Sequence, residues 1–348
     1  FAWPYEEQTH IKHKVLGAYA KIWVSKLGCK KNTLFFDCHG GCGAYINNEK
    51  SIFYGSSIIV KNVADEINAT RETKTGVIYC EKDANNYNNF LQVLNDHPNI
   101  KISKYNSKFE DIISQKNVKE YYNKYPTLFF VDPFGFDFKI GDLSGLMDGF
   151  GNEIIINFMF DFINRFISVP SIEGSYSDFF GSDSWKNANN LSGPVRENYL
   201  VSIFKEKLRE ITHANYVFAY RLCYPYKDQT YYYLIHATNH IDGITLMKSA
   251  FASVNNGRVQ YLGKNSNNMS FFDLSSVKSN ELYSLHLSKY KGQKVSFDAI
   301  WRDIVEDTAY TSKDLSLALI ELEKNGVLKL ERVSSKRGSY KDKDLIYF

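Results

Sequence analysis

Leu34-Phe35-Phe36-Asp37-Cys38-His39-Gly40-Gly41-Cys42-Gly43 is the stretch that decides the fold. It has a counterpart further along the chain in Leu128-Phe129-Phe130-Val131-Asp132-Pro133-Phe134-Gly135. Each stretch is an apolar run that ends in an aspartate and then a turn, as a buried parallel strand does. Open α/β sheets bind their ligands at the carboxyl ends of such strands. Together the two stretches predict a nucleotide-like cofactor beside a group that holds a planar substrate.

Helices and strands alternate on both sides of these stretches. The expected strands are 33–37, 76–81, 99–105, a strand that ends at Asp132, and 153–158. The expected helices are 9–26, 57–69, 84–96, 108–124, 140–149 and 196–212, and the polar stretch 167–195 is expected to be a loop. Strands that alternate with helices predict βαβ units and a doubly wound, mostly parallel sheet.

Two aromatic runs near the end of this α/β pattern predict an antiparallel hairpin. The runs are 216–222 and 231–236, and the turn between them is Tyr224-Pro225-Tyr226-Lys227-Asp228. A mostly parallel sheet that ends in a hairpin is typical of the seven-stranded, Rossmann-like fold of class I methyltransferases that use S-adenosylmethionine (SAM). The plain dinucleotide-binding fold lacks this hairpin. We therefore expect a domain of the methyltransferase type over residues 1–253.

The pattern changes after a polar connecting segment at 254–290. Two short helices, a strand, a basic loop and a returning strand follow, at 297–305, 312–324, 327–333, 334–338 and 345–348. This order predicts a small winged helix-turn-helix domain over residues 291–348.

The charges of this small domain leave its partner open. The wing carries Lys336, Arg337 and Lys341, which suit contact with phosphate groups. The second helix carries Glu321 and Glu323, which repel phosphate. Contact with nucleic acid and contact with a protein partner are therefore both expected alternatives.

Composition sets wider limits. The chain has 348 residues, 44% of them hydrophobic, which is enough for one large domain and a small one. A net charge of +3 does not single out a polyanionic partner. The five cysteines form no C-x-x-C pair, and Cys38, His39 and Cys42 are an incomplete set of metal ligands. We expect a reducing, cytoplasmic setting and no metal. There is no signal-peptide pattern, and no apolar run approaches the roughly 20 residues of a membrane span.

The glycine-rich turn and the acid after the next strand form the candidate cofactor site. Glycines allow a tight turn and a close approach of the backbone to a ligand. An acid at the end of the second strand suits a bidentate hydrogen bond to a ribose diol. A plain turn and a solvated strand-end acid remain alternatives. The candidate residues are Asp37, His39, Gly40, Gly41, Gly43, Glu81 and Asn106.

The second turn carries the candidate catalytic residues Asp132, Pro133 and Phe134. Methylation of an exocyclic amine requires the nitrogen lone pair to leave conjugation and to point at the methyl donor. A carboxylate and a backbone carbonyl can accept the two N–H groups, and an aromatic ring can stack on an extruded base. Proline stiffens the turn. The alternative is a structural Asp-Pro turn, which occurs in many α/β proteins.

The chain resembles the three-Cys-motif partner proteins, a bacterial and archaeal group regarded as SAM-dependent methyltransferases. The resemblance rests on motifs along most of the chain: Thr9, Lys12-His13, Leu16, Tyr19 and Trp23; Asp37 with Tyr45; Gly55-Ser56; Asp132-Pro133-Phe134-Gly135; Asn157; Tyr224-Pro225; Tyr233-Leu234-Ile235-His236-Ala237-Thr238-Asn239-His240; and Met247-Lys248. It implies a neighbouring protein with three cysteines as partner. The family's turn is usually Phe-Ala-Gly-Pro-Gly, so this chain departs from it at 38–43.

More distantly, the glycine turn is similar to that of a ribosomal-RNA adenine-N6 methyltransferase, and Asp-Pro-Phe-Gly to that of tRNA guanine-N2 methyltransferases. Both resemblances imply methylation of an amine on RNA or DNA, with adenine N6 favoured and guanine N2 as the alternative. By the same analogy Lys12, His13, Tyr45 and Gly135 line the site.

Two rival functions follow from the same residues. In the first, a catalytically silent methyltransferase fold serves as a nucleic-acid-binding or scaffold subunit, and the altered turn has lost SAM. In the second, the chain is an NAD-dependent enzyme. The hairpin and the Asp-Pro-Phe-Gly turn argue against the second rival.

Overall fold

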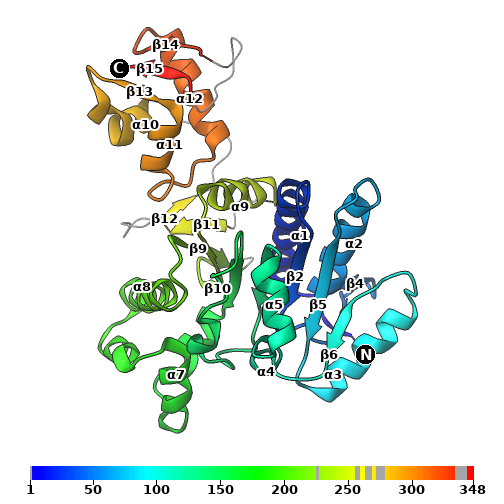
Figure 1. Cartoon of the computed structure of the whole chain (residues 1–348). Helices are drawn as coiled ribbons and strands as arrows, with labels where there is room; N and C mark the ends of the chain where they lie inside the picture. Colours follow the sequence, from blue (N-terminus) through cyan, green and yellow to red (C-terminus); the bar gives the residue numbers. More distant parts are fainter. Residues whose placement is uncertain (1, 225–226, 255–258, 263–268, 272–278, 334–342) are drawn as a thin grey trace. The chain divides into compact units, whose positions relative to one another are not determined.

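The computed structural model describes residues 2–224, 227–254, 259–262, 269–271, 279–333 and 343–348 (Figure 1). The chain forms two compact units, Phe1–Leu246 and Met247–Phe348. The division falls inside helix α9 (Ile241–Val254), close to the domain end expected at residue 253. Within the described ranges, no helix is long and apolar enough to cross a membrane.

The first unit contains a mixed β-sheet in which neighbouring strands follow the order β9-β10-β8-β7-β2-β5-β6. The five strands from β8 to β6 are parallel, whereas β10 is antiparallel to both β8 and β9. The expected parallel sheet that ends in an antiparallel hairpin is therefore confirmed. The bounds are β2 (Thr33–Asp37), β5 (Thr75–Cys80), β6 (Ser103–Tyr105), β7 (Thr127–Val131), β8 (Glu153–Phe158), β9 (Tyr216–Cys223) and β10 (Thr230–Thr238).

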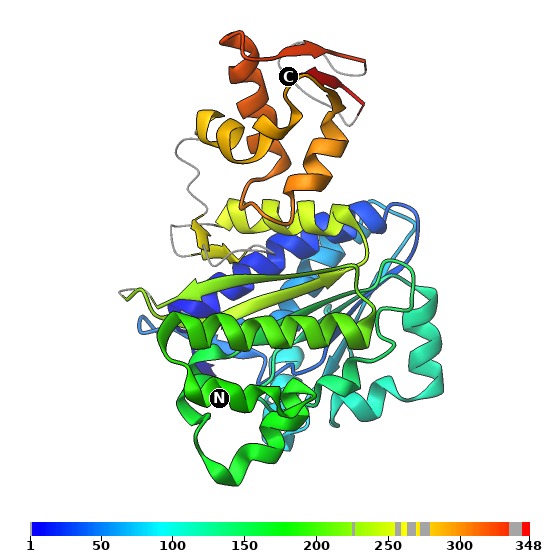
Figure 2. The ribbon, with the colours of Figure 1, turned by 90° about the vertical axis from the view of Figure 1, so that its left-hand side faces the viewer.

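Helices cover both faces of this sheet (Figures 1 and 2). Alternate side chains of β10 show which helix covers which face. Tyr232 donates its hydroxyl to the Gln8 carbonyl of α1 (Glu7–Leu27), and Tyr233 donates to Glu197 of α8 (Gly193–Thr212). The period of two along a strand sends neighbouring rings to opposite faces, so the sheet is buried on both sides. Helices α2 (Ser56–Asn68) and α3 (Ala84–Asn95) complete the first half of the unit.

Several expected elements differ in the structure. The helix expected at 108–124 is two helices, α4 (Phe109–Ile113) and α5 (Lys116–Lys124). The helix expected at 140–149 is only the 3₁₀ turn η1 (Ile140–Leu143), because Gly145 and Gly151 adopt left-handed conformations that end regular structure. The expected loop 167–195 follows α6 (Phe160–Phe166) and contains the short helices η2 (Pro170–Ile172), α7 (Glu173–Phe180) and η3 (Asp183–Asn190).

A small three-stranded sheet interrupts the first βα unit. The glycine turn after β2 leads into β3 (Ala44–Ile46), which pairs with β1 (Trp3–Pro4) and with β4 (Ile52–Tyr54). Helix α2 begins only after this insert, at Ser56. The turn at 38–43 is therefore followed by a strand and not by the amino end of a helix.

The second unit contains a three-stranded antiparallel sheet and two capped helices. The sheet order is β13-β15-β14, with bounds Lys294–Ser296, Leu345–Tyr347 and Lys329–Glu331. Ser296 caps α11 (Phe297–Ile304), and Thr311 with Asp314 forms a capping box on α12 (Ser312–Lys324). Residues 254–290 were expected to form only a connecting segment. They contain β11 (Val259–Leu262), β12 (Met269–Phe271), α10 (Ser279–Leu282), η4 (Tyr283–Leu287) and η5 (Ser288–Tyr290). Lys336, Arg337 and Lys341 lie outside the described residues.

Candidate functional site

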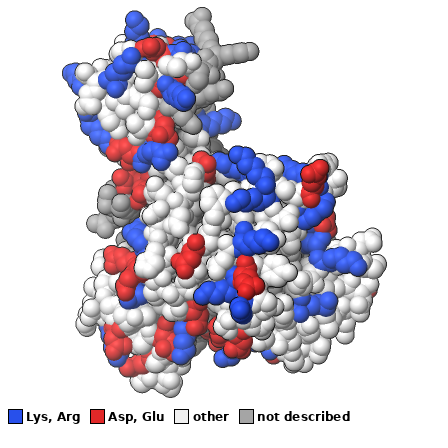
Figure 3. Space-filling model, in the orientation of Figure 1, with Lys and Arg blue, Asp and Glu red and all other residues white. Residues whose placement is uncertain are grey.

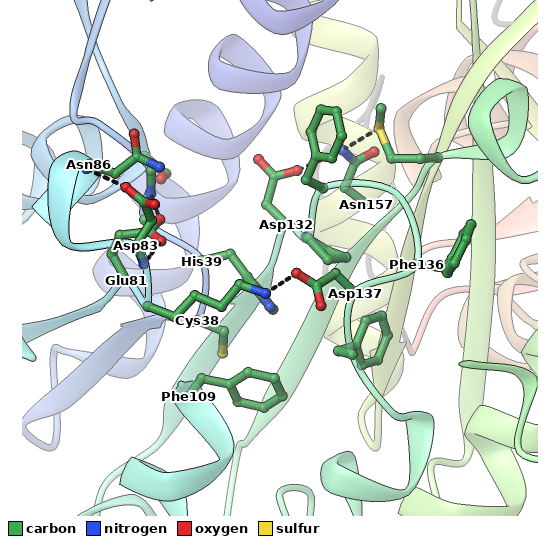
Figure 4. Close-up of a pocket in the computed structure, with 18 of the residues that line it drawn as sticks. Cys38, His39, Glu81, Asp83, Asn86, Phe109, Asp132, Phe136, Asp137 and Asn157 are labelled. Carbon is green, nitrogen blue, oxygen red and sulfur yellow. Dashed lines mark hydrogen bonds and ion pairs between the residues drawn. The ribbon is translucent and has the colours of Figure 1, made fainter. Parts of the chain in front are cut away.

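A cavity of about 700 Å³ lies at the carboxyl ends of the parallel strands. Its walls come from the segments that follow β2, β5, β6, β7 and β8, as open α/β sheets predict. Figure 4 shows Glu81 and Asp83 on one side, Asp132 and Asn157 on the other, and His39 between them. The two turns that the sequence singled out therefore share one cavity.

The glycine turn forms the floor between the two halves of the cavity. Gly40 and Gly41 line it, whereas Gly43 lies behind them against α3. A Cβ at Gly40 would overlap the ring of Tyr79, and one at Gly43 would lie 2.5 Å from the ring of Phe90. Gly43 also has a φ of +77°, which side chains rarely adopt. Glycine at these positions is thus required by packing on Tyr79 and Phe90, and the backbone of Gly40 and Gly41 is left open to a ligand.

Glu81 lies at the end of β5 and holds the glycine turn in place. Its Oε2 accepts the Gly41 N–H at 2.9 Å, and its Oε1 accepts the Asp83 N–H at 2.8 Å. The side chain is largely buried and lines the cavity, and this burial raises the pKa of the carboxyl group. Each oxygen of a carboxylate can accept two hydrogen bonds, so both retain a site for a hydroxyl of a ligand.

Asp37 lies beneath the cavity and is not among the residues that line it. Its Oδ2 accepts the hydroxyl groups of Ser56 at 2.5 Å and Ser57 at 2.7 Å, while its Oδ1 is buried without a hydrogen-bond partner in the described structure. Burial raises the pKa of Asp37 to about 7. The structure thus places this residue as the link between β2 and the start of α2, not against a ligand.

Asn106 is also drawn away from the cavity. Its Nδ2 donates to the carbonyl groups of Glu81, at 2.8 Å, and Lys82. The neighbouring residues Ser107, Lys108 and Phe109 line the cavity instead. Asn106 therefore supports the strand end that carries Glu81, and the wall after β6 is made by the next residues of the chain.

Asp132 is held by two donors from different elements. Lys12 Nζ of α1 lies 2.5 Å from Asp132 Oδ2, and Asn157 Nδ2 of β8 lies 2.6 Å from Oδ1. Lys12 and Asn157 are buried, the side chain of Asp132 is 14% exposed, and all three line the cavity. Charge-assisted hydrogen bonds of this kind fix the plane of a carboxylate. The arrangement leaves the remaining lone pairs of Asp132 as acceptors for a group in the cavity.

The residues after Asp132 form the outer wall. Pro133 and Phe134 line the cavity, and Phe134 is 77% exposed, with its ring in an edge-to-face contact with Phe162. Gly135 is not in the wall; its φ of +69° turns the chain beside Phe162. A proline has no N–H to donate, so the Pro133 backbone presents only its carbonyl. An exposed aromatic ring beside an oriented carboxylate is suited to a planar ligand with an N–H donor.

Ion pairs join the loops around the cavity. Lys82, which follows β5, pairs with Asp137, which follows β7, so that this pair spans the end of β2 (Figure 4). Lys139 pairs with Asp178 at 3.0 Å. The lysines of the rim are thus neutralised by carboxylates of the rim.

The lining as a whole carries more acids than bases. The acidic residues are Glu6, Glu81, Asp83, Glu110, Asp132, Asp137 and Asp178, and the basic residues are Lys12, Lys82, Lys108 and Lys139. His39 lies in the same wall, and burial lowers its pKa to about 4, so it is neutral at pH 7. The cavity therefore favours a cationic ligand over an anionic one.

His13 and Tyr45 lie together on the side of α1. Tyr45 lines the cavity, whereas His13 lies behind it, with the two rings 5.1 Å apart in an edge-to-face arrangement. His13 is buried and its Nδ1 has no hydrogen-bond partner in the described part of the chain. Burial, with the neighbouring charge of Lys12 as a smaller cause, lowers the pKa of His13 to about 3.

The buried histidines predict a loss of stability in acid. Unfolded His13 and His39 take up protons near pH 6.5, but the folded protein resists this until about pH 3 and pH 4. The unfolded state therefore binds more protons as pH falls below 6.5, and the free energy of unfolding decreases. From pH 7 to pH 5, His13 alone should remove about 2 kcal/mol, at 1.36 kcal/mol for each pKa unit.

The measurement is urea unfolding of the wild-type protein and His13→Phe at pH 7 and pH 5. We expect the wild type to lose more stability than the variant between the two pH values. Asp37 acts in the opposite direction, because its raised pKa makes the folded state bind the extra proton between pH 3.8 and about 7. Asp37 is present in both proteins, so its effect cancels when the two losses of stability are compared. Equal losses would contradict the assignment.

Sequence reasoning missed several residues of the site. Trp3 lies against Gly41, where a Cβ would be 3.1 Å from its ring. Asn157 was noted only as part of a family motif, and its contact with Asp132 depends on the pairing of β7 with β8. Asp83 and Asn86 line the cavity at the start of α3. The only signal in the sequence for Asp83 and Asn86 was their position shortly after the strand that ends at Cys80. Among the described residues no group of three His, Cys, Asp or Glu side chains could hold a metal ion.

Comparisons with known proteins give similarities of structure only. No protein-family model and no curated protein matches the sequence. Protein LPL1258 from Legionella pneumophila, with the family model DUF519, is 14% identical with a TM-score of 0.42; the match covers 72% of this chain and 94% of that one. A proposed SAM-dependent methyltransferase from Methanococcus maripaludis is 13% identical, with a TM-score of 0.34 and coverages of 64% and 84%. The plantazolicin methyltransferase BamL, solved with SAH, is 13% identical, with a TM-score of 0.38 and coverages of 67% and 87%.

Proposed function

We propose that this protein is a SAM-dependent methyltransferase that acts on an exocyclic amino group of a nucleic-acid base, adenine N6 in the first place and guanine N2 as the alternative. The observation that carries the proposal is the position of Asp132. An oriented carboxylate lies at the end of β7, in the same cavity as the open glycine backbone at the end of β2.

Two features of the cavity favour SAM over a dinucleotide. The pyrophosphate of NAD is bound at the amino end of a helix that directly follows the glycine turn. Here the turn leads into strand β3, and α2 begins at Ser56. The lining is also acidic, which suits the net positive charge of SAM and repels a pyrophosphate. The strand order with its terminal hairpin supports the same choice.

The residues of the chain would divide the work as follows. Gly40 and Gly41 give the donor a close approach to the backbone, and Glu81 accepts its ribose hydroxyls. Asp132 and the Pro133 carbonyl accept the two N–H groups of the substrate amine, which turns the nitrogen lone pair towards the donor. SAM supplies the activated methyl group. The nitrogen–methyl bond forms as the methyl–sulfur bond breaks, and the displaced N–H proton passes to Asp132 or to water.

The hydrogen bonds of Asp132 also define how the site is prepared. Lys12 and Asn157 hold the carboxylate in one orientation before the substrate arrives. Phe134 provides an exposed ring on which a base can stack. The acceptor-only character of Asp132 and of the Pro133 backbone selects an amino group over a carbonyl group at the same position of a base.

We further propose that the second unit is a winged helix and that the chain has a partner protein with three cysteines. The order β13-α11-α12-β14-β15 supports the first proposal. The second rests on the resemblance of the sequence to the three-Cys-motif partner family.

The experiment has two steps. Calorimetry with SAM should show binding, with NAD as the matched control. Incubation with methyl-labelled SAM and separate pools of DNA, tRNA and rRNA, followed by nucleoside analysis, should then yield N6-methyladenosine or N2-methylguanosine. The rival in which the fold is a silent scaffold predicts no heat with SAM. Binding of SAM without a methylated nucleoside would disprove the substrate assignment but not the cofactor.

A further inference from the structure

Three connecting segments meet at the end of the sheet opposite the cavity. They precede the amino ends of β2, β7 and β8, which are neighbours in the sheet. A Cβ at Gly151 would lie 3.2 Å from Pro126 and 3.6 Å from Leu27, so the segment before β8 touches both others. Asn152 Nδ2 also donates to the carbonyl of Tyr122, near the end of α5, at 3.0 Å.

Aromatic rings and lysines gather on these three segments, and all of them are exposed except Tyr125, which is half-buried. We call this set the basic–aromatic patch: Lys30, Lys31, Tyr121, Lys124, Tyr125 and Phe150. Phe150 is 69% exposed and Tyr121 is 56% exposed, although large aromatic side chains are normally buried. Lys31 Nζ lies 4.6 Å from the centre of the Phe150 ring, and Lys124 Nζ lies 5.2 Å from that of Tyr125. Tyr121 and Tyr125 are stacked at 6.2 Å.

The lysines of the patch differ from those around the cavity. Within the described ranges, no carboxylate pairs with Lys30, Lys31 or Lys124, whereas Lys82 and Lys139 at the cavity rim are both paired. Figure 3 shows Lys and Arg side chains gathered around the near ends of α1 and α5, with fewer acidic side chains among them. Glu120 on α5 and Asp148, two residues before Phe150, are exposed acids close to the patch. The three lysines of the patch outnumber these two acids, whereas acids outnumber bases in the cavity.

We propose that the basic–aromatic patch binds single-stranded nucleic acid. Single strands are held by cations that contact phosphates and by aromatic rings on which bases stack. The patch offers both, on one surface. An acidic peptide or an anionic membrane would use the lysines, but neither offers planar bases that stack on the exposed rings of Tyr121 and Phe150.

The inference extends the proposed function, because it rests on a nucleic acid being the substrate. The patch lies at the amino ends of β2 and β7 and the cavity at their carboxyl ends, so the two are separated by about 17 Å along a five-residue strand. A single-stranded nucleic acid that reached both the patch and the cavity would follow the surface of the protein for more than this distance. The patch then holds a remote segment of the substrate while Asp132 acts on one base.

The test is fluorescence anisotropy with labelled dT20, dA20 and U20 and the full chain. Lys31→Ala with Lys124→Ala removes two charges, and we expect at least about tenfold weaker binding at 0.1 M salt, with a salt slope reduced by about 1.4 (about 0.7 for each phosphate contact). Phe150→Ala with Tyr121→Ala should weaken binding about tenfold or more with an unchanged salt slope. Lys21→Ala, which breaks a surface pair with Glu66, and Val195→Ala, a truncation of an exposed apolar side chain, are the matched controls.

The outcomes separate the inference from the proposed function. The same loss in the control variants, equal binding of poly-glutamate, or binding of anionic vesicles in place of oligonucleotides would overturn the patch as a nucleic-acid site. SAM calorimetry on the same variants should be unchanged, since none of them lines the cavity. Oligonucleotide binding that survives both double variants would also overturn it, even if SAM binds and methyl transfer proceeds.

Discussion

Asp132→Asn is expected to lower kcat for methyl transfer by about 10² to 10⁴, the usual contribution of a positioned acid or base, and to leave the Kd for SAM nearly unchanged. The side chain keeps its size, but one carboxylate oxygen becomes an N–H₂ group that points a donor at the amine or at Lys12. The amine then loses the acceptor that turns its lone pair towards the donor. Labelled-SAM turnover and SAM calorimetry on the same preparation measure the two quantities.

Asp137→Asn is the matched control, because Asp137 also lines the cavity and also pairs with a lysine, but its side chain is 54% exposed. We expect its activity to stay within about threefold of wild type, as for an exposed ion pair. The double variant Lys12→Met with Asp132→Leu tests for misfolding, since it removes both charges and leaves no unpaired one. Activity in Asp132→Asn close to wild type would show that Asp132 is not catalytic.

Glu81→Ala is expected to raise the Kd for SAM by about 10- to 100-fold. Hydrogen bonds to a charged group contribute about 1.5–3 kcal/mol, and the variant loses those to the ribose hydroxyls. It also leaves the Gly41 and Asp83 N–H groups without their acceptor, so the glycine turn is no longer held. Calorimetry with SAM measures the effect, and thermal unfolding reports how much comes from the turn itself.

Glu81→Gln separates the two causes. The amide oxygen can still accept one backbone N–H, but the nitrogen cannot accept a ribose hydroxyl. We expect a Kd and a melting temperature between those of the wild type and Glu81→Ala, because the amide nitrogen leaves one of the two backbone N–H groups without an acceptor. A melting temperature that falls as in Glu81→Ala, with SAM affinity unchanged, would restrict Glu81 to a structural role.

The fold could be predicted from the sequence because each strand ends in a local signal. The apolar runs before Asp37 and Asp132 and the aromatic runs 216–222 and 231–236 each mark a strand without knowledge of its partner. The break between α4 and α5 could not be predicted, since Ser114-Gln115 interrupts a continuous helical pattern only weakly. The local propensity of two polar residues does not decide whether a helix continues.

The sequence predicted which two turns form the candidate site, but not the hydrogen bonds that their side chains make. Asp37 and Asp132 have the same sequence context, yet one is buried under Ser56 and Ser57 and the other faces the cavity. The difference comes from the insert β3–β4, which brings α2 back over the end of β2. Lys12 and Asp132 are 120 positions apart, and such a contact depends on how α1 packs on the sheet.

The ion pair between Lys82 and Asp137 joins two segments at the rim of the cavity. It joins two loops that are otherwise carried by different strands, and both partners are about half exposed. Exposed ion pairs are weak and are screened by salt. At high ionic strength this pair weakens, so the segments that follow β5 and β7 are joined less firmly at the rim of the cavity.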